Sequence, residues 1–188
     1  CVFDPDFLIT GKRIVCIGEA VLVAFWLFFS ISFARIDYWG AGSKASKLLL
    51  LLSPALLIFT LSSRTEDIFS SNLYDNTEKM LFLGEKGYIF YLILLLYSVL
   101  TIINLEITLR NSSGANKWQI KYVLLGTGGI IALNIFYYSY ALLYRSLNMN
   151  LLPVRNGVVM ISTLMIGYSI FRHKSMDVEI RVSRNIIY

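Results

Sequence analysis

Long apolar runs are the feature that most constrains what this chain can fold into. The first run, residues 14–33, carries Glu19 as its only charged residue. As a helix with a rise of about 1.5 Å per residue it would reach about 30 Å, the thickness of the hydrocarbon core of a bilayer. Four comparable runs follow it along the chain. We therefore expect about five membrane spans, near residues 14–33, 45–63, 88–109, 118–144 and 152–171.

The composition agrees with a lipid environment. Apolar residues make up 56% of the 188 residues and charged residues only 15%, which is too little charge to cover a soluble surface. The net charge is +5, but the basic residues lie between apolar runs and form no stripe with interleaved aromatic residues. We therefore predict an all-α polytopic transmembrane helix bundle. Its expected partner is the lipid bilayer, with no nucleic acid.

The connections between the runs indicate an orientation. Residues 64–87 form a long acidic connection, whereas residues 172–188 after the last run are basic. More Lys and Arg fall on the side of the C terminus than on the other side, which predicts a cytoplasmic C terminus and an outer loop at 64–87. That loop could be a solvated linker or a surface for a partner. Its apolar stretch, residues 80–83, favours folding back onto the membrane surface or the bundle.

Ionisable residues inside spans are costly, so each is a candidate for function. Glu19 in the first span and Arg155 in the fifth lie at similar depth, and we expect them to pair. Such a pair could fix the order of the helices or respond to a signal. Glu106 and Arg110 have the i,i+4 spacing of a local pair at the membrane interface.

Three further features of the spans predict local packing. Asn134 and Tyr138 share one face of the fourth span and suggest an interhelical hydrogen bond. Gly128 and Ala132 have the small-xxx-small spacing of a helix-packing face. Pro54 should kink the second span unless neighbouring groups satisfy the carbonyl that it frees.

Catalytic patterns are missing from the sequence. Its single histidine, His173, lies among charged residues next to the last span and has no partners typical of a metal or phosphoacceptor site. We predict no catalytic residues, no metal site and no enzymatic activity for this chain.

Several blocks of the second half resemble the membrane region of PrsK-type sensor histidine kinases, which are associated with the PEP-CTERM and exosortase systems of bacteria. The resemblance extends from about residue 80 to the end. It rests on residues 104–106 and 108–110, on the block 118–122 and on the block 182–184. The family-motif candidates are Trp118, Lys121, Tyr122, Ser183 and Arg184.

The resemblance implies a polytopic N-terminal sensor that is followed by further membrane helices, a GAF domain, a phosphoacceptor histidine domain and an ATPase domain. ATP and Mg are then expected only in those domains, and the chain is expected to be a piece truncated at both ends. The implied setting is a multi-pass protein of the bacterial cytoplasmic (inner) membrane. Its implied partners are a second copy, forming a homodimer, and a cognate response regulator.

We therefore expect the input region of a two-component sensor histidine kinase, which passes a signal inward by rearranging its helices. The alternative is a fragment of a transporter or channel, suggested by Pro54 and the charged residues within the spans. Inverted repeats would favour that alternative, and none is seen. A membrane enzyme would need a cluster of His or acidic residues at one depth, which the sequence does not supply.

Overall fold

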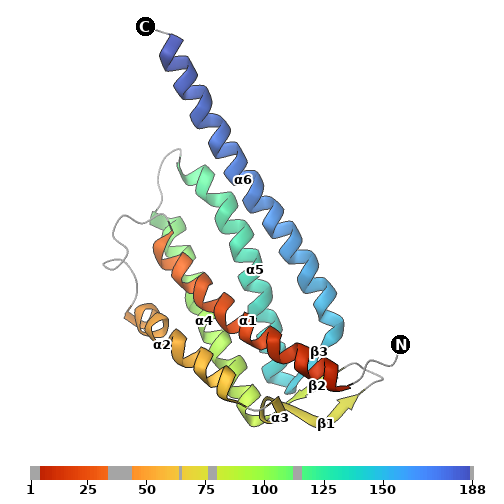
Figure 1. The fold of residues 1–188 in the computed structure, drawn as a ribbon. Helices are drawn as coiled ribbons and strands as arrows, with labels where there is room; N and C mark the ends of the chain where they lie inside the picture. Colours follow the sequence, from red (N-terminus) through yellow and green to blue (C-terminus); the bar gives the residue numbers. More distant parts are fainter. Residues whose placement is uncertain (1–4, 34–43, 64, 76–79, 112–115, 187–188) are drawn as a thin grey trace.

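The structure is a computed structural model that describes residues 5–33, 44–63, 65–75, 80–111 and 116–186. Five helices run back and forth to form one bundle (Figure 1). They are α1 (Pro5–Ser32), α2 (Lys44–Ser62), α4 (Glu85–Asn111), α5 (Asn116–Tyr144) and α6 (Leu152–Ile186). The predicted all-α membrane bundle is confirmed, because four of the described helices are long and apolar enough to cross a membrane.

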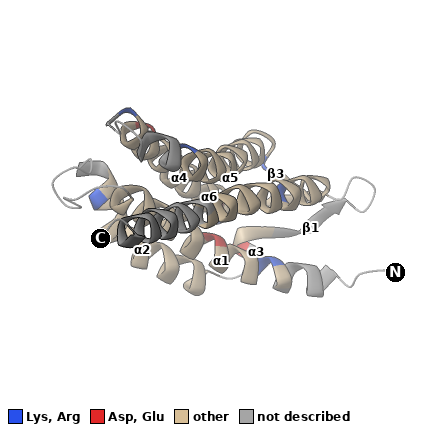
Figure 2. Cartoon of the chain, turned by 90° about the horizontal axis from the view of Figure 1, so that it is seen from above, with Lys and Arg blue, Asp and Glu red and all other residues tan. Residues whose placement is uncertain are grey.

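The membrane-length segments follow the apolar runs closely. They are Gly11–Ser32 of α1, Glu85–Arg110 of α4, Lys121–Tyr144 of α5, and Met149–Ser169, which includes the start of α6. The apolar part of α2, Ser46–Ser62, is shorter, at about 25 Å against the roughly 30 Å of a bilayer core. Figure 2 shows that most of the described ribbon is neither acidic nor basic, as a lipid-facing bundle requires.

Helix α2 continues through Pro54 because a neighbouring side chain replaces the missing donor. Proline lacks the N–H that would reach the carbonyl of Leu50, four residues earlier. The hydroxyl of Ser53 donates a hydrogen bond to that carbonyl oxygen at 2.8 Å. The freed carbonyl is therefore satisfied within the helix.

The predicted outer loop is folded. Within residues 64–87 the chain forms α3 (Thr65–Ile68), β1 (Phe69–Asp75) and β2 (Met80–Leu83), and α4 begins at Glu85. Strand β2 pairs antiparallel with β1 and with β3 (Ser146–Asn148), which lies between α5 and α6. Leu81 and Leu83 are buried on one side of β2, following the two-residue period of a strand. The apolar stretch thus packs onto the bundle.

Two glycines let the segment that contains α3 approach the start of α4 closely. A Cβ atom at Gly84 would collide with the carbonyl oxygen of Asp67, and one at Gly87 with that of Ile68. The same junction is held by a salt bridge of 2.7 Å from Lys86 Nζ to Asp67 Oδ2. The end of α3 is therefore fixed against the first turn of α4.

Helix α5 lies between α4 and α6, whereas α1 packs mainly against α2 and α4. The glycines that bring α5 close to α6 are Gly126 and Gly129, which face Ser162 and Ile166 of α6. The prediction of a packing face at Gly128 and Ala132 is wrong, since a Cβ at Gly128 would meet nothing within 4 Å and Ala132 is exposed. The reason is the rotation of α5 about its axis, which the apolar sequence on all sides of this helix does not reveal.

Helix α6 continues beyond the last span. Its membrane-length part ends at Ser169, whereas the helix, 35 residues in all, ends at Ile186. It extends beyond the other helices of the bundle (Figure 1).

Candidate functional site: a charged groove between α1 and α6

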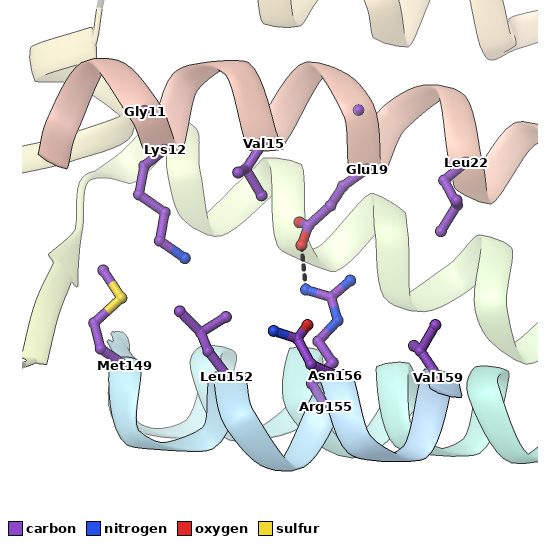
Figure 3. Close-up of a pocket in the computed structure, with 11 residues that line it drawn as sticks. Gly11, Lys12, Val15, Glu19, Leu22, Met149, Leu152, Arg155, Asn156 and Val159 are labelled. Carbon is purple, nitrogen blue, oxygen red and sulfur yellow. Dashed lines mark hydrogen bonds and ion pairs between the residues drawn. The ribbon is translucent and has the colours of Figure 1, made fainter. Parts of the chain in front are cut away.

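A groove of about 740 Å³ lies between α1 and the start of α6, close to the end of the bundle that carries the sheet (Figure 3). Most of its wall is apolar, with charged and amide groups in the middle and at one end. The lining residues are Gly11, Lys12, Val15, Gly18, Glu19, Leu22, Met149, Leu152, Arg155, Asn156 and Val159.

Glu19 and Arg155 meet across this groove. Arg155 Nη1 donates a hydrogen bond to Glu19 Oε1 at 2.5 Å, and the two side chains are only 14% (Arg155) and 6% (Glu19) exposed. A buried charge needs a partner, because an isolated one loses its hydration without compensation. An arginine in the first turn of a helix is also opposed by the helix dipole. Glu19 therefore explains how Arg155 is tolerated at this position.

Tyrosines from the helices behind the groove complete the surroundings of Arg155. Its guanidinium lies 5.1 Å from the ring centre of Tyr137 and 6.0 Å from that of Tyr138, both on α5. The ring of Tyr138 in turn packs 5.7 Å from that of Tyr91 on α4. These cation–π contacts supply attraction to the cation without a second anion. Four helices thus contribute to the position of a single guanidinium group.

The charges of the described residues that line the groove are not balanced. Lys12, 9% exposed, lines the same groove as the pair and takes part in none of the salt bridges formed among the described residues. Glu19 Oε2 is buried and has no hydrogen-bond partner in the described part of the chain. Sequence reasoning missed Lys12, although its spacing of seven residues from Glu19 places both on one face of a helix.

The second predicted pair lies elsewhere. Arg110 Nη2 donates to Glu106 Oε1 at 2.7 Å near the opposite end of the bundle. Both side chains are more than half exposed, so this pair contributes only a few tenths of a kcal/mol by the usual range for i,i+4 pairs, about 0.2–0.5 kcal/mol. It has the geometry of a local surface pair.

The hydrogen bond expected from Asn134 and Tyr138 is not made by their oxygen atoms. Both residues are buried, but Asn134 Oδ1 and the Tyr138 hydroxyl have no hydrogen-bond partner in the described ranges. Their shared face turns toward the protein core, where Tyr138 packs against aromatic rings and the guanidinium of Arg155. Tyr138 therefore belongs to the groove through its ring.

An interhelical hydrogen bond that sequence reasoning missed lies at Asn104. Its amide Nδ2 donates to the hydroxyl of Ser46 at 2.9 Å and lies 3.5 Å from that of Ser30, so it joins α4 to α2 and α1. The sequence feature that could have indicated this bond is an amide side chain within the apolar run of α4.

The family-motif candidates lie far from the groove. Lys121 is exposed on α5, and the ring of Tyr122 packs edge to face with Tyr168 of α6 at 6.4 Å. Trp118 lies on α5, and Ser183 and Arg184 lie on α6; their side chains are outside the described part of the structure.

Fold and groove together define a multi-pass membrane protein with a charged ligand-sized groove between two helices. Residues 3–179 match the family of the N-terminal 7TM region of histidine kinases, and the chain belongs to that family. It forms the transmembrane sensor region of a histidine kinase, as the sequence predicted. This assignment decides against the transporter or channel fragment. No curated protein and no solved structure matches the chain.

Proposed function

We propose that the Glu19–Arg155 pair is the point at which this sensor region registers its signal, and that α6 carries the change toward the kinase domains. The observation that supports this proposal is the continuity of α6. Arg155 lies in its first turn, and the same helix continues to Ile186 over 35 residues, or about 50 Å. If the helix shifts as a rigid body, a displacement of its first turn also moves its far end.

The packing of α6 allows it to shift relative to α1. Its main neighbour is α5, and the ion pair to Glu19 ties its first turn to α1. A signal shifts a conformational equilibrium only if it interacts differently with the two states. Any stimulus that strengthens or breaks the pair has this property, because the pair forms only where α1 and α6 hold Glu19 and Arg155 within hydrogen-bond distance. Shifts of packed helices by about 1–2 Å are a common output of such events.

In the full-length protein we expect a histidine kinase that uses ATP and Mg, works as a homodimer and phosphorylates a response regulator. The resemblance of residues 118–122 and 182–184 to PrsK-type kinases supports membership of the PEP-CTERM-associated subtype. We also propose a bacterial inner-membrane location with a cytoplasmic C terminus and the sheet outside, supported by the loop charges. Labelling of Asp75→Cys but not Asp177→Cys by an impermeant thiol reagent is expected, and the reverse pattern would refute this orientation.

The activity test compares charge removal in the groove with charge removal outside it. The full-length protein in membrane vesicles would carry Arg155→Gln, Glu19→Gln or the matched control Arg110→Gln, which removes the same charge from the exposed pair. We expect autophosphorylation per molecule to change at least about three-fold in the groove variants, because breaking one strong interaction shifts a balanced equilibrium by this much or more. The control should resemble the wild type. Wild-type activity and stimulus response in Arg155→Gln at equal membrane amounts would refute the proposal.

A further inference from the structure

The groove has binding capacity that the ion pair does not use. Arg155 donates to Glu19 through Nη1, and the guanidinium carries further N–H donors. Lys12 points its ammonium group into the groove from α1 (Figure 3). Among the described lining residues, two cations and one carboxylate leave a net positive charge in a largely dehydrated place. A single negative group would neutralise it.

The rest of the wall is suited to a hydrocarbon. Val15 and Leu22 of α1 face Leu152 and Val159 of α6 across the groove (Figure 3). Val15, Leu22 and Val159 are also 37–43% exposed on membrane-length helices, so the groove is open toward the side that lipid covers. A molecule could enter sideways from the bilayer.

We propose that this groove binds an amphiphile with one anionic headgroup and one hydrocarbon chain, a long-chain carboxylate taken up from the bilayer. Its carboxylate would lie between the ammonium of Lys12 and the N–H donors of Arg155 that do not bind Glu19, and its chain along the apolar wall toward Leu22 and Val159. The volume of about 740 Å³ is within the usual range for a pocket that holds one drug-sized molecule. A charge-assisted hydrogen bond to each cation explains the choice of an anion over an alcohol.

This inference rests on the proposed function and names its stimulus class. A ligand carboxylate on the other donors of Arg155 would lie close to the Glu19 carboxylate, and repulsion between the two anions would weaken the link between α1 and α6. The free energy of binding is thereby coupled to the position of α6.

The test measures binding directly, so that it is independent of kinase output. The full-length protein in phosphatidylcholine nanodiscs is irradiated with a photoreactive palmitate, and the cross-linked peptides are identified. Competitors are unlabelled palmitate, palmityl alcohol, the short soluble anion acetate, and phosphatidylglycerol. We expect cross-links on α1 and α6 at the groove and competition by palmitate alone.

Two variants with matched controls locate the site. Lys12→Gln removes one cation and should weaken palmitate binding about ten-fold, the value of one charge-assisted hydrogen bond, whereas Lys121→Gln on the exposed surface of α5 should not. Gly18→Leu fills the groove at a position where a Cβ meets no atom within 4 Å, and should abolish binding. Gly167→Leu makes the same change in equally open space outside the groove and should have no effect.

Other results would overturn the inference. Competition by phosphatidylglycerol would make the occupant a bilayer phospholipid, and competition by acetate would make it a soluble anion. If palmityl alcohol competes as well as palmitate, or if Lys12→Gln binds palmitate as tightly as the wild type, the charge of the headgroup does not contribute to binding. If no probe binds while Arg155→Gln still changes autophosphorylation, the proposed function stands and the ligand assignment fails.

Discussion

Glu19 of α1 and Arg155 of α6 are 136 residues apart in sequence, and one hydrogen-bonded ion pair joins them in the half of the bundle near the sheet. The main packing partners of these helices are different, since α1 packs against α2 and α4 and α6 packs against α5. The pair is therefore a specific link between two parts of the bundle.

Removing either partner of this pair should destabilise the fold. A lone buried charge costs about 3–5 kcal/mol, and Glu19→Gln should cost more than Arg155→Gln because it leaves the two cations Lys12 and Arg155 together. The double variant should cost less than the sum of the singles. Unfolding free energies of all four proteins in a double-mutant cycle measure this coupling, and strictly additive losses would show that the pair does not hold the helices together.

Asn104→Leu should destabilise the bundle by about 1 kcal/mol, because it removes the hydrogen bond to Ser46 that joins α4 to α2. Asn134→Leu is the matched control. It removes a buried amide whose Oδ1 has no hydrogen-bond partner among the described residues, and should be neutral or stabilising. Denaturant unfolding in the same detergent compares the two, and an equal loss for both would contradict the assignment.

Gly126→Ala should loosen the contact between α5 and α6. The added Cβ would lie 2.9 Å from the carbonyl oxygen of Ser162 and 2.8 Å from Cγ1 of Ile166, so the helices must separate at a cost of about 1–3 kcal/mol. Gly128→Ala, two residues away, meets open space and should be neutral or slightly stabilising. The thermal unfolding midpoints of the two variants test this expectation. A lower midpoint for Gly128→Ala than for Gly126→Ala would mean that the other face of α5 contacts α6.

The membrane spans could be predicted because a bilayer requires long apolar helices. The similar depth of Glu19 and Arg155 could be predicted because the number of residues from the end of each span gives the depth of a side chain in the membrane. The rotation of each helix could not be predicted in this way. Helix α5 is apolar on both its lipid-facing and its protein-facing sides, so periodicity did not show that Gly126 faces α6 or that Asn134 Oδ1 has no hydrogen-bond partner among the described residues.

The sheet was missed for a different reason. Strand β3 has only three residues, and its pairing with β2 brings together two connections that are distant in sequence. Local pattern gives no sign of such a contact, although the apolar residues 80–83 indicated that the connection packs on something. Lys12 was missed because charged residues near the end of a span are usual, and only the position of α6 shows that this one faces Arg155.

The central claim, that the ion pair sets the position of α6 relative to α1, is tested most directly by a distance measurement. Spin labels at Phe28→Cys on α1 and Leu164→Cys on α6, both exposed positions, report the separation of the helices in the full-length protein in nanodiscs. With Arg155→Gln we predict a shift of the distance distribution by about 2 Å or more, together with the change in autophosphorylation. An unchanged distribution alongside altered autophosphorylation would contradict the account.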